Sequence, residues 1–281
     1  MEYLDRRREQ VDERLSTVVG GVEPPELKAQ LSHVALAGGK RVRPMVAVLS
    51  CEAAGGDAED ALDFAVGIEL VHNASLVIDD IIDESDVRRG TESAWTKYGH
   101  GPALIASDGL LGEALALFVS EPAAMQAVTD AMVELGGGEA TELLDRPDSE
   151  QAYLELARRK TGVLFRAAAE VGAIAAGADA STVAAFGEYA ERVGIAFQIR
   201  DDVLDATADA DDLGKPTGQD AAMDRPSVVE VTDLSHEEAN ERALEHSEAA
   251  LAALRSVDDL GGKEARTYLQ DLAEFVVVRE R

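Results

Sequence analysis

Two acidic clusters of identical spacing carry the clearest chemical signal in this chain of 281 residues. In the first, Asp79, Asp80 and Asp83 stand at i, i+1 and i+4, so the first and last share one face of a helix. The second cluster, at 201–205, repeats that spacing. Like charges four residues apart destabilise a bare helix, so each cluster calls for a cation. Carboxylate oxygens suit Mg²⁺, which keeps several waters and accepts phosphate oxygens of a substrate.

A single acidic triplet is weak evidence, because aspartate and glutamate make up 55 of the 281 residues and a solvated acidic face is the alternative. Both triplets, however, follow apolar sequence: Ala-Ser-Leu-Val-Ile at 74–78 and Gly-Ile-Ala-Phe-Gln-Ile at 194–199. Two such helices that face each other would place up to six carboxylates around one cavity. The pattern therefore predicts a site for several divalent cations and a polyanionic ligand.

Residues suited to bind an anion recur near the predicted helices. Lys40 and Arg43 belong to Gly-Gly-Lys-Arg-Val-Arg-Pro at 38–44, just before a predicted helix start, where backbone N–H groups also attract anions. His72 lies two turns before the first triplet, and Gln198 lies three residues before the second. A basic turn and a core histidine are the alternative interpretations.

Lysine is scarce, with six lysines against twenty arginines, so the remaining lysines mark places where an ammonium is needed. Half of them lie in possible anion-binding stretches: Lys40, Lys160 in Lys-Thr-Gly, and Lys215 in a glycine-rich loop at 212–220 that could close over bound phosphates. Arg88 and Arg89 are expected to end the first acidic helix, and their guanidinium forks match phosphate oxygens.

The elements that must position these groups are helices. The eight prolines fall where helices could start or loops could run, and no convincing strand pattern appears. Asp57, Ser149 and Ser235 are predicted helix caps. We expect ten helices, at 3–19, 25–37, 43–54, 58–84, 102–120, 122–144, 150–176, 181–207, 236–254 and 263–279. The fold class is all-α, with 1–281 as a single domain built as one large helical bundle.

Charge and composition narrow the class of protein. A formal net charge of −29 argues against nucleic-acid binding through a basic face, and 46% apolar residues argue against disorder. The acidic, lysine-poor composition resembles that of proteins from salt-accumulating halophiles. A lone Cys51 excludes an intrachain disulfide. No signal-peptide apolar region and no stretch of eighteen apolar residues occur, so we expect a cytoplasmic protein without a membrane span.

Taken in order, these motifs resemble those of the trans-isoprenyl diphosphate synthases, the polyprenyl synthetase family that includes farnesyl and geranylgeranyl diphosphate synthases. The resemblance spans roughly residues 35–230 and rests on Gly-Gly-Lys-Arg-x-Arg-Pro, Glu-Leu-Val-His-x-x-Ser-Leu, Asp-Asp-x-x-Asp with Arg-Arg-Gly, Lys-Thr-Gly, Phe-Gln-x-x-Asp-Asp-x-x-Asp and Gly-Lys-Pro-x-Gly-x-Asp. It implies a helical bundle around a deep central cavity, and a homodimer.

The resemblance also implies a role for each matched residue. Isopentenyl diphosphate would be held by Lys40, Arg43, His72 and Arg89. The allylic diphosphate would be held by Arg88, Lys160, Gln198 and Lys215, with Thr161 close by. Several Mg²⁺ ions would be bound by Asp79, Asp83 and Asp201, with Asp80, Asp202 and Asp205 in support. Arg225 stands in a loop where the family commonly has a lysine.

The implied reaction fits these residue types. Cations around the allylic diphosphate stabilise it as a leaving group, so the allylic C–O bond ionises. The carbocation alkylates the double bond of isopentenyl diphosphate, and loss of a proton completes the elongation. The product would extend past Ser75, Ala74 and Val71, upstream of Asp79 on the same helix, and the small side chains at the first two positions predict geranylgeranyl diphosphate. A terpene cyclase on the same fold and a non-catalytic partner subunit are the alternatives.

Overall fold

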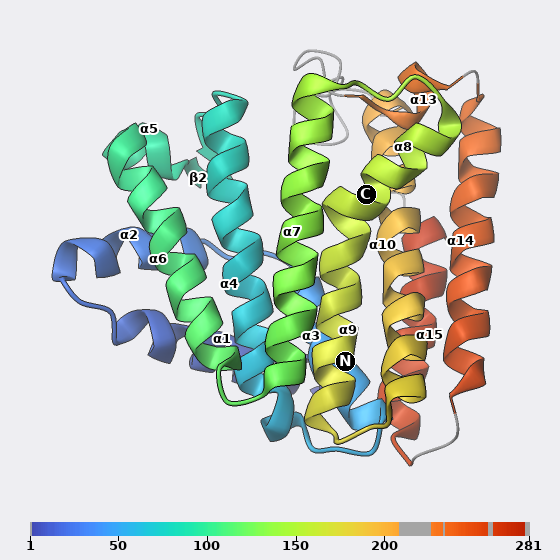
Figure 1. The fold of residues 1–281 in the computed structure, drawn as a ribbon, viewed down its shortest axis with the longest axis horizontal. Coiled ribbons are helices and arrows are strands. Elements are labelled where there is room, and N and C mark those ends of the chain that lie inside the picture. The colour runs from blue at the N-terminus through green and yellow to red at the C-terminus, as the bar shows by residue number, and fades with distance from the viewer. Residues whose placement is uncertain (1, 208–225, 233, 258–260, 279–281) are drawn as a thin grey trace.

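A computed structural model of the chain describes residues 2–207, 226–232, 234–257 and 261–278 (Figure 1). Its helices are α1 (Glu2–Gly20), α2 (Pro25–Ala35), α3 (Val42–Ala53), α4 (Ala58–Ile82), α5 (Ala94–Tyr98), α6 (His100–Phe118), α7 (Pro122–Leu144), α8 (Glu150–Ala157), α9 (Val163–Ala175), α10 (Ala180–Thr207), α13 (Val228–Val231), α14 (His236–Ser256) and α15 (Lys263–Val278). The strands β1 (Val87–Arg88) and β2 (Thr91–Glu92) form a short antiparallel ribbon. The predicted all-α class is confirmed.

The long helices lie side by side and nearly parallel to one axis (Figure 1). Helices α4, α7, α9, α10 and α14 are the vertical members in that view, with α3 and α15 behind them and α6 beside α4. The C-terminal ends of α4, α7 and α10 lie at the same end of the bundle. The two acidic clusters therefore meet at that end, because each stands near the C-terminal end of its helix.

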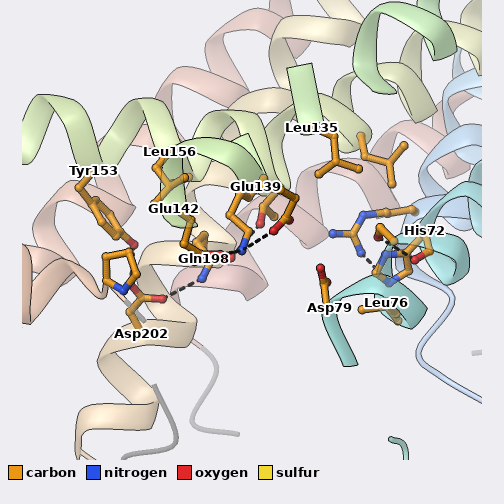
Figure 2. Close-up of a pocket in the computed structure, with 17 residues that line it drawn as sticks. His72, Leu76, Asp79, Leu135, Glu139, Glu142, Tyr153, Leu156, Gln198 and Asp202 are labelled. Carbon is orange, nitrogen blue, oxygen red and sulfur yellow. Dashed lines mark hydrogen bonds and ion pairs between the residues drawn. The ribbon is translucent and has the colours of Figure 1, made fainter. Parts of the chain in front are cut away.

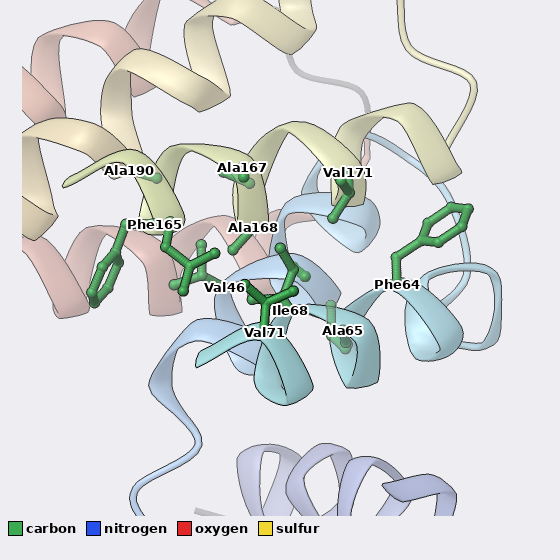
Figure 3. Packing of buried hydrophobic residues seen from close by; sticks show 14 of the residues in the cluster. Val46, Phe64, Ala65, Ile68, Val71, Phe165, Ala167, Ala168, Val171 and Ala190 are labelled. Atoms are coloured by element: carbon green, nitrogen blue, oxygen red, sulfur yellow. The ribbon is translucent and has the colours of Figure 1, made fainter. Parts of the chain in front are cut away.

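Small side chains let the central helices approach closely. Val46 of α3, Ile68 and Val71 of α4, and Ala168 of α9 are all buried in one hydrophobic core (Figure 3). A Cβ built on Gly172 of α9 would lie 2.1 Å from the backbone oxygen of Ala47 in α3, so only glycine fits this contact. The dense core of alanine and glycine keeps the helices rigidly packed below the end of the bundle where the acidic clusters meet.

The predicted caps are confirmed. Asp57 and Ser235 each belong to a capping box with the residue three positions on, and the Ser149 hydroxyl accepts a hydrogen bond from the backbone N–H of Ala152. The continuous helix predicted at 150–176 is wrong, because a π-helical turn at Arg158–Gly162 separates α8 from α9.

Glycines make room for this wide turn. A Cβ on Gly138 of α7 would lie 2.9 Å from the Cβ of Arg159, and one on Gly194 of α10 would lie 2.9 Å from the Cα of Gly162. The turn therefore bulges between two neighbouring backbones. Apolar periodicity does not reveal a turn of this kind, because it changes the helix by a single residue.

The expected end of the first acidic helix also needs correction. Helix α4 ends at Ile82 with Asp83 as its C-cap, and Arg88 and Arg89 lie beyond it in the β ribbon and its turn. Arg89 and Gly90 both have positive φ, of 51° and 77°, which makes the tight reversal between the strands. The two arginines are thus folded back along α4 instead of extending it.

Two helices, α4 and α6, are long and apolar enough to cross a membrane by length and composition. In α4, 67% of the apolar window is buried inside the bundle, as expected of a central core helix. In α6 only 33% is buried, and Ile105 is 58% exposed. Within the described residues, α6 therefore keeps more of its apolar surface exposed than α4 does.

Candidate active site

A pocket of about 180 Å³ lies at the end of the bundle where the acidic clusters meet (Figure 2). Eight of the predicted site residues line it: Arg43, His72, Ser75, Asp79, Lys160, Thr161, Gln198 and Asp202. Its other lining residues include Glu139, Glu142, Tyr153, Leu135, Leu156 and Leu164. Motifs that are far apart in the chain therefore converge on one cavity, which polar side chains and leucines line together.

The first acidic cluster divides between two sides of α4. Asp79 faces the pocket (Figure 2), whereas Asp80 is 3% exposed and accepts hydrogen bonds from the Arg88 guanidinium. The distances from Asp80 Oδ1 to Arg88 are 2.7 Å at Nε and 2.5 Å at Nη2. Asp83 caps the helix end. Asp80 therefore orients Arg88 and the ribbon, while Asp79 is the member of the cluster that faces the cavity.

The second cluster uses its middle aspartate in the same way. Asp202 is 2% exposed, and its carboxylate accepts hydrogen bonds from the Tyr153 hydroxyl (2.6 Å), Gln198 Nε2 (2.8 Å) and the backbone N–H of Val228 (2.9 Å). Burial raises the pKa of Asp202 to about 6, and these hydrogen bonds limit the rise. Asp202 thus fixes Gln198 and joins α8, α10 and α13, while Asp201 and Asp205 stand one residue before it and three after it on α10.

The carboxylates fit Mg²⁺ that arrives with a diphosphate. Within the ranges that the structure describes, no three His, Cys, Asp or Glu side chains converge tightly enough to hold a metal by themselves. Mg²⁺ is commonly bound through one or two carboxylates, waters and substrate phosphates, so a ready-made protein cage is not required. Asp79 offers such a carboxylate inside the pocket, across from the α10 cluster.

Lys160 enters the pocket from the π-helical turn. Its Nζ is bonded to Glu142 and lies 3.4 Å from Glu139, both on α7. Burial disfavours the Lys160 ammonium, but the two carboxylates outweigh it and raise its pKa. Burial also raises the pKa of Glu139 to about 7, with Asp79 and Glu142 adding to the effect and Lys160 opposing it. Lys160 is thus held charged in the pocket by a pair of acids.

The sequence analysis did not predict that Glu139 and Glu142 belong to the site. Glu139 and Glu142 stand at i, i+3 directly after three glycines, so their spacing already placed them on one helix face. The signal was hidden because so many acids in this chain coat the surface. Tyr153 escaped for a different reason, since its partner Asp202 is 49 residues away in the chain.

Arg43 and His72 form the cationic wall of the pocket. Arg43 Nη1 donates to His72 Nε2 at 3.2 Å, and its guanidinium lies 4.8 Å from the centre of the Phe165 ring. Burial lowers the pKa of Arg43 to about 10, so it stays charged at neutral pH. Burial and the nearby arginines hold the pKa of His72 well below its usual range, so the imidazole is neutral. Among the described residues, the buried Nε of Arg43 has no hydrogen-bond partner, as suits a cation that awaits an anion.

The other predicted anion ligands lie around this pocket, not in its lining. Arg88 and Arg89 line a second cavity of about 20 Å³ on an adjacent face of α4, and Leu76 lines both cavities. Arg89 nevertheless reaches the glycine turn before α3, because its Nη1 donates to the backbone oxygen of Gly38 at 2.7 Å. Lys40 lines a surface groove between α1, α3 and α15. Lys215 and Arg225 lie outside the described residues.

The three predicted chain-length residues occupy different layers. Ser75 lines the pocket, one turn below Asp79. Ala74 and Val71 are each 1% exposed and belong to the hydrophobic core, and the backbone oxygen of Ala74 accepts a hydrogen bond from Ser107 of α6. Ser75 is therefore the residue of the three that meets the pocket directly.

Comparison with known proteins agrees with this geometry. Residues 24–260 match the family described as Polyprenyl synthetase. The chain is 35% identical over 255 residues to a short chain isoprenyl diphosphate synthase of Methanothermobacter thermautotrophicus, covering 87% of this chain and 78% of that one. It is 31% identical to a geranylgeranyl diphosphate synthase of Methanosarcina mazei, covering 100% and 98%. The crystal structure of a geranylgeranyl pyrophosphate synthetase from Pyrococcus horikoshii superposes with a TM-score of 0.91 at 32% identity, covering 99% and 98%.

Proposed function

The chain belongs to the polyprenyl synthetase family and is a trans-prenyltransferase, and we propose that its pocket condenses isopentenyl diphosphate with an allylic diphosphate to give mainly geranylgeranyl diphosphate. The observation that supports this assignment is the convergence of Asp79, Lys160 and Arg43 on one pocket that leucine side chains also line. Bound Mg²⁺ would supply Lewis-acid stabilisation of the allylic diphosphate. A cytoplasmic location remains a prediction.

The residues divide the work between two substrates. Lys160 and Gln198 hold the allylic diphosphate and stabilise the negative charge that develops on this leaving group as the C–O bond breaks. Arg43 and Arg89 hold isopentenyl diphosphate beside neutral His72. Leu135, Leu156 and Leu164 enclose the growing chain and exclude water, which would otherwise quench the carbocation.

The alternatives explain fewer of these residues. A terpene cyclase has no use for the Arg43 and His72 wall, because it binds a single diphosphate. A non-catalytic partner subunit gives no reason to keep both aspartate clusters whole. The relatives are named as synthases, in line with the elongating activity.

Product length provides the test of the whole proposal. Incubated with Mg²⁺, isopentenyl diphosphate and a C15 allylic primer, the protein should form a C20 product, measured by chromatography after dephosphorylation. With a shorter primer, Ser75→Phe should shift the main product toward C15, because a phenyl ring one turn below Asp79 fills the pocket. Absence of any prenyl product in the presence of Mg²⁺ would contradict the function.

Ala74→Phe is the control for Ser75→Phe, because it adds the same ring at the preceding residue. Ala74 is packed in the core near α6, so the larger ring should lower the melting temperature more than it changes product length. If a folded, active Ser75→Phe variant keeps a C20 or C25 main product, Ser75 does not border the growing chain and the length assignment loses its basis.

We further propose a homodimer that covers the apolar face of α6. Leu104 and Ile105 on α6 are 47% and 58% exposed, and only two charged residues, Asp108 and Glu113, interrupt the helix. Such an exposed apolar helix in a chain of net charge −29 is typical of a contact between subunits. Ile105→Asp is expected to convert dimers to monomers in light-scattering measurements.

Phe275→Asp is the control, because Phe275 on α15 has the same exposure, 57%, but lies on another helix. It should leave the dimer intact. A wild-type protein that is monomeric across the micromolar range, or dissociation by Phe275→Asp alone, would show that α6 is not the interface.

A further inference from the structure

Glu69 is a buried carboxylate of α4 that does not line the pocket. It is 2% exposed, and its Oε1 accepts a hydrogen bond of 2.6 Å from Arg41 Nη1. The same oxygen lies 3.3 Å from Asn73 Nδ2 and 3.8 Å from Arg89 Nη2. One buried acid therefore stands between two guanidinium groups that come from different loops.

Arg41 is an anchor whose donors are used within the protein. Besides Glu69, its Nε donates to Asp12 at 2.8 Å and its Nη2 donates to the backbone oxygen of Ala35 at 2.9 Å. The residue is 4% exposed and has a φ of 53°, a left-handed conformation that is strained for a bulky side chain. These contacts therefore hold the turn at 38–41 in a conformation that it would not otherwise keep.

Arg89 is held in the same network but less tightly. Its Nη1 donates to Gly38 O at 2.7 Å and to Asn73 Oδ1 at 3.1 Å, whereas the 3.8 Å approach to Glu69 is too long for a hydrogen bond. A Cβ on Gly39 would lie 2.9 Å from the guanidinium carbon, so the Arg89 head rests against the glycine turn. Its side chain stays 20% exposed and accessible to an anion.

Glu69 also acts on Arg43, the cation of the pocket wall. Its negative charge favours the ionised form of Arg43, while the charge of Arg89 disfavours it. Arg41 and Arg89 thus lie beside one carboxylate whose negative charge also favours the charge of Arg43. Without that carboxylate the three guanidinium groups would repel one another in a poorly solvated region.

We propose that Glu69, with Asn73, is a positioning residue for isopentenyl diphosphate. It fixes Arg89 and the turn at 38–41 so that Arg89 and Arg43 meet the diphosphate together, and it does not touch the substrate. This inference rests on the proposed function. Glu69 opens the motif Glu-Leu-Val-His-x-x-Ser-Leu and Asn73 stands at one of its unspecified positions, and the sequence gave neither residue a role.

The test compares the KM for isopentenyl diphosphate with the KM for the allylic substrate, because only the first should change. Glu69→Gln keeps the shape of the side chain but removes its charge, and it should raise the KM for isopentenyl diphosphate by about tenfold or more. The KM for the allylic substrate should stay within about twofold, because Lys160 and Gln198 are held by separate contacts. Asn73→Leu, which removes the side-chain acceptor of Arg89, should raise only the first KM, by about threefold.

Two controls separate positioning from stability. Glu52→Gln breaks a similar part-buried ion pair, with Arg7, that joins α1 to α3 away from the pocket, so it should lower the melting temperature without changing either KM. The double variant Glu69→Met with Arg41→Met replaces the buried pair by apolar side chains and should recover the melting temperature. Its KM for isopentenyl diphosphate should remain raised, because Arg89 still lacks the carboxylate of Glu69 that fixes its position.

Three outcomes would overturn the inference: an unchanged KM for isopentenyl diphosphate in Glu69→Gln, an equal rise of both constants, or full recovery of KM in the double variant. Each requires an active wild-type enzyme. A wild-type protein that elongates no allylic primer would instead refute the proposed function, so the two failures are distinguishable.

Discussion

Asp79→Asn should lower kcat by about 10³-fold while leaving the helical fold intact. Asp79 is the member of the first cluster that faces the pocket, where it would hold Mg²⁺, and removal of one group that supports stabilisation of the leaving diphosphate commonly costs 10²–10³-fold. The measurement is steady-state turnover of the allylic substrate, with circular dichroism to follow the fold. A second readout is thermal protection by Mg²⁺ with inorganic diphosphate, which the variant should lose.

Asp80→Asn is the control for Asp79→Asn, because it makes the same change at the next residue of the cluster. Asp80 is bonded to Arg88 and turned away from the pocket, so its loss should act through the ribbon and cost only about 10–100-fold. Near-normal turnover in Asp79→Asn, or a larger loss in Asp80→Asn, would contradict the division of the cluster between the two sides of α4.

Lys160→Gln should lower kcat/KM for the allylic diphosphate by about 10²-fold, since a hydrogen bond to a charged group contributes about 1.5–3 kcal/mol. The KM for isopentenyl diphosphate should change little, because Arg43 and His72 hold that substrate on the other wall. The measurement is initial rates with each substrate varied in turn. Loss of Lys160 also leaves Glu139 and Glu142 without their cation, which adds repulsion toward the substrate.

Arg159→Gln is the control for that variant. Arg159 is the preceding residue, is paired with Glu155 four residues earlier, and does not line the pocket. It should retain both kinetic constants within about twofold. Equal losses in the two variants would mean that the wide turn, and not the Lys160 ammonium, is what matters.

Local patterns in the sequence were enough to predict most of the fold. Proline positions, caps and apolar periodicity placed the long helices within a few residues, because each of these signals acts within one or two turns. The ribbon at 87–92 and the short helices α5 and α13 were missed, since elements of two to five residues carry no periodicity. Their positions depend on tertiary contacts, such as the hydrogen bond that Arg88 donates to Asp80.

The site was predicted less evenly. Spacing showed that Asp79 and Asp83 could share a face, but it could not show that Asp80 turns to Arg88 or that Asp202 turns to Tyr153. Those choices are made by partners 8 and 49 residues away, which no local pattern contains. The spacing of Glu139 and Glu142 could be read from the sequence, but it did not distinguish them from the many other acidic residues of this chain.

The π-helical turn at Arg158–Gly162 also sets the direction in which the side chains of α8 point relative to those of α9. Each residue of an α-helix turns the chain by about 100°, so the extra residue of a π-helical turn rotates α8 by that amount relative to α9. Deletion of one residue here would restore a regular helix and swing Tyr153 away from Asp202. Surface connections such as 21–24 can change length with little effect, whereas in this turn the number of residues is itself part of the catalytic geometry.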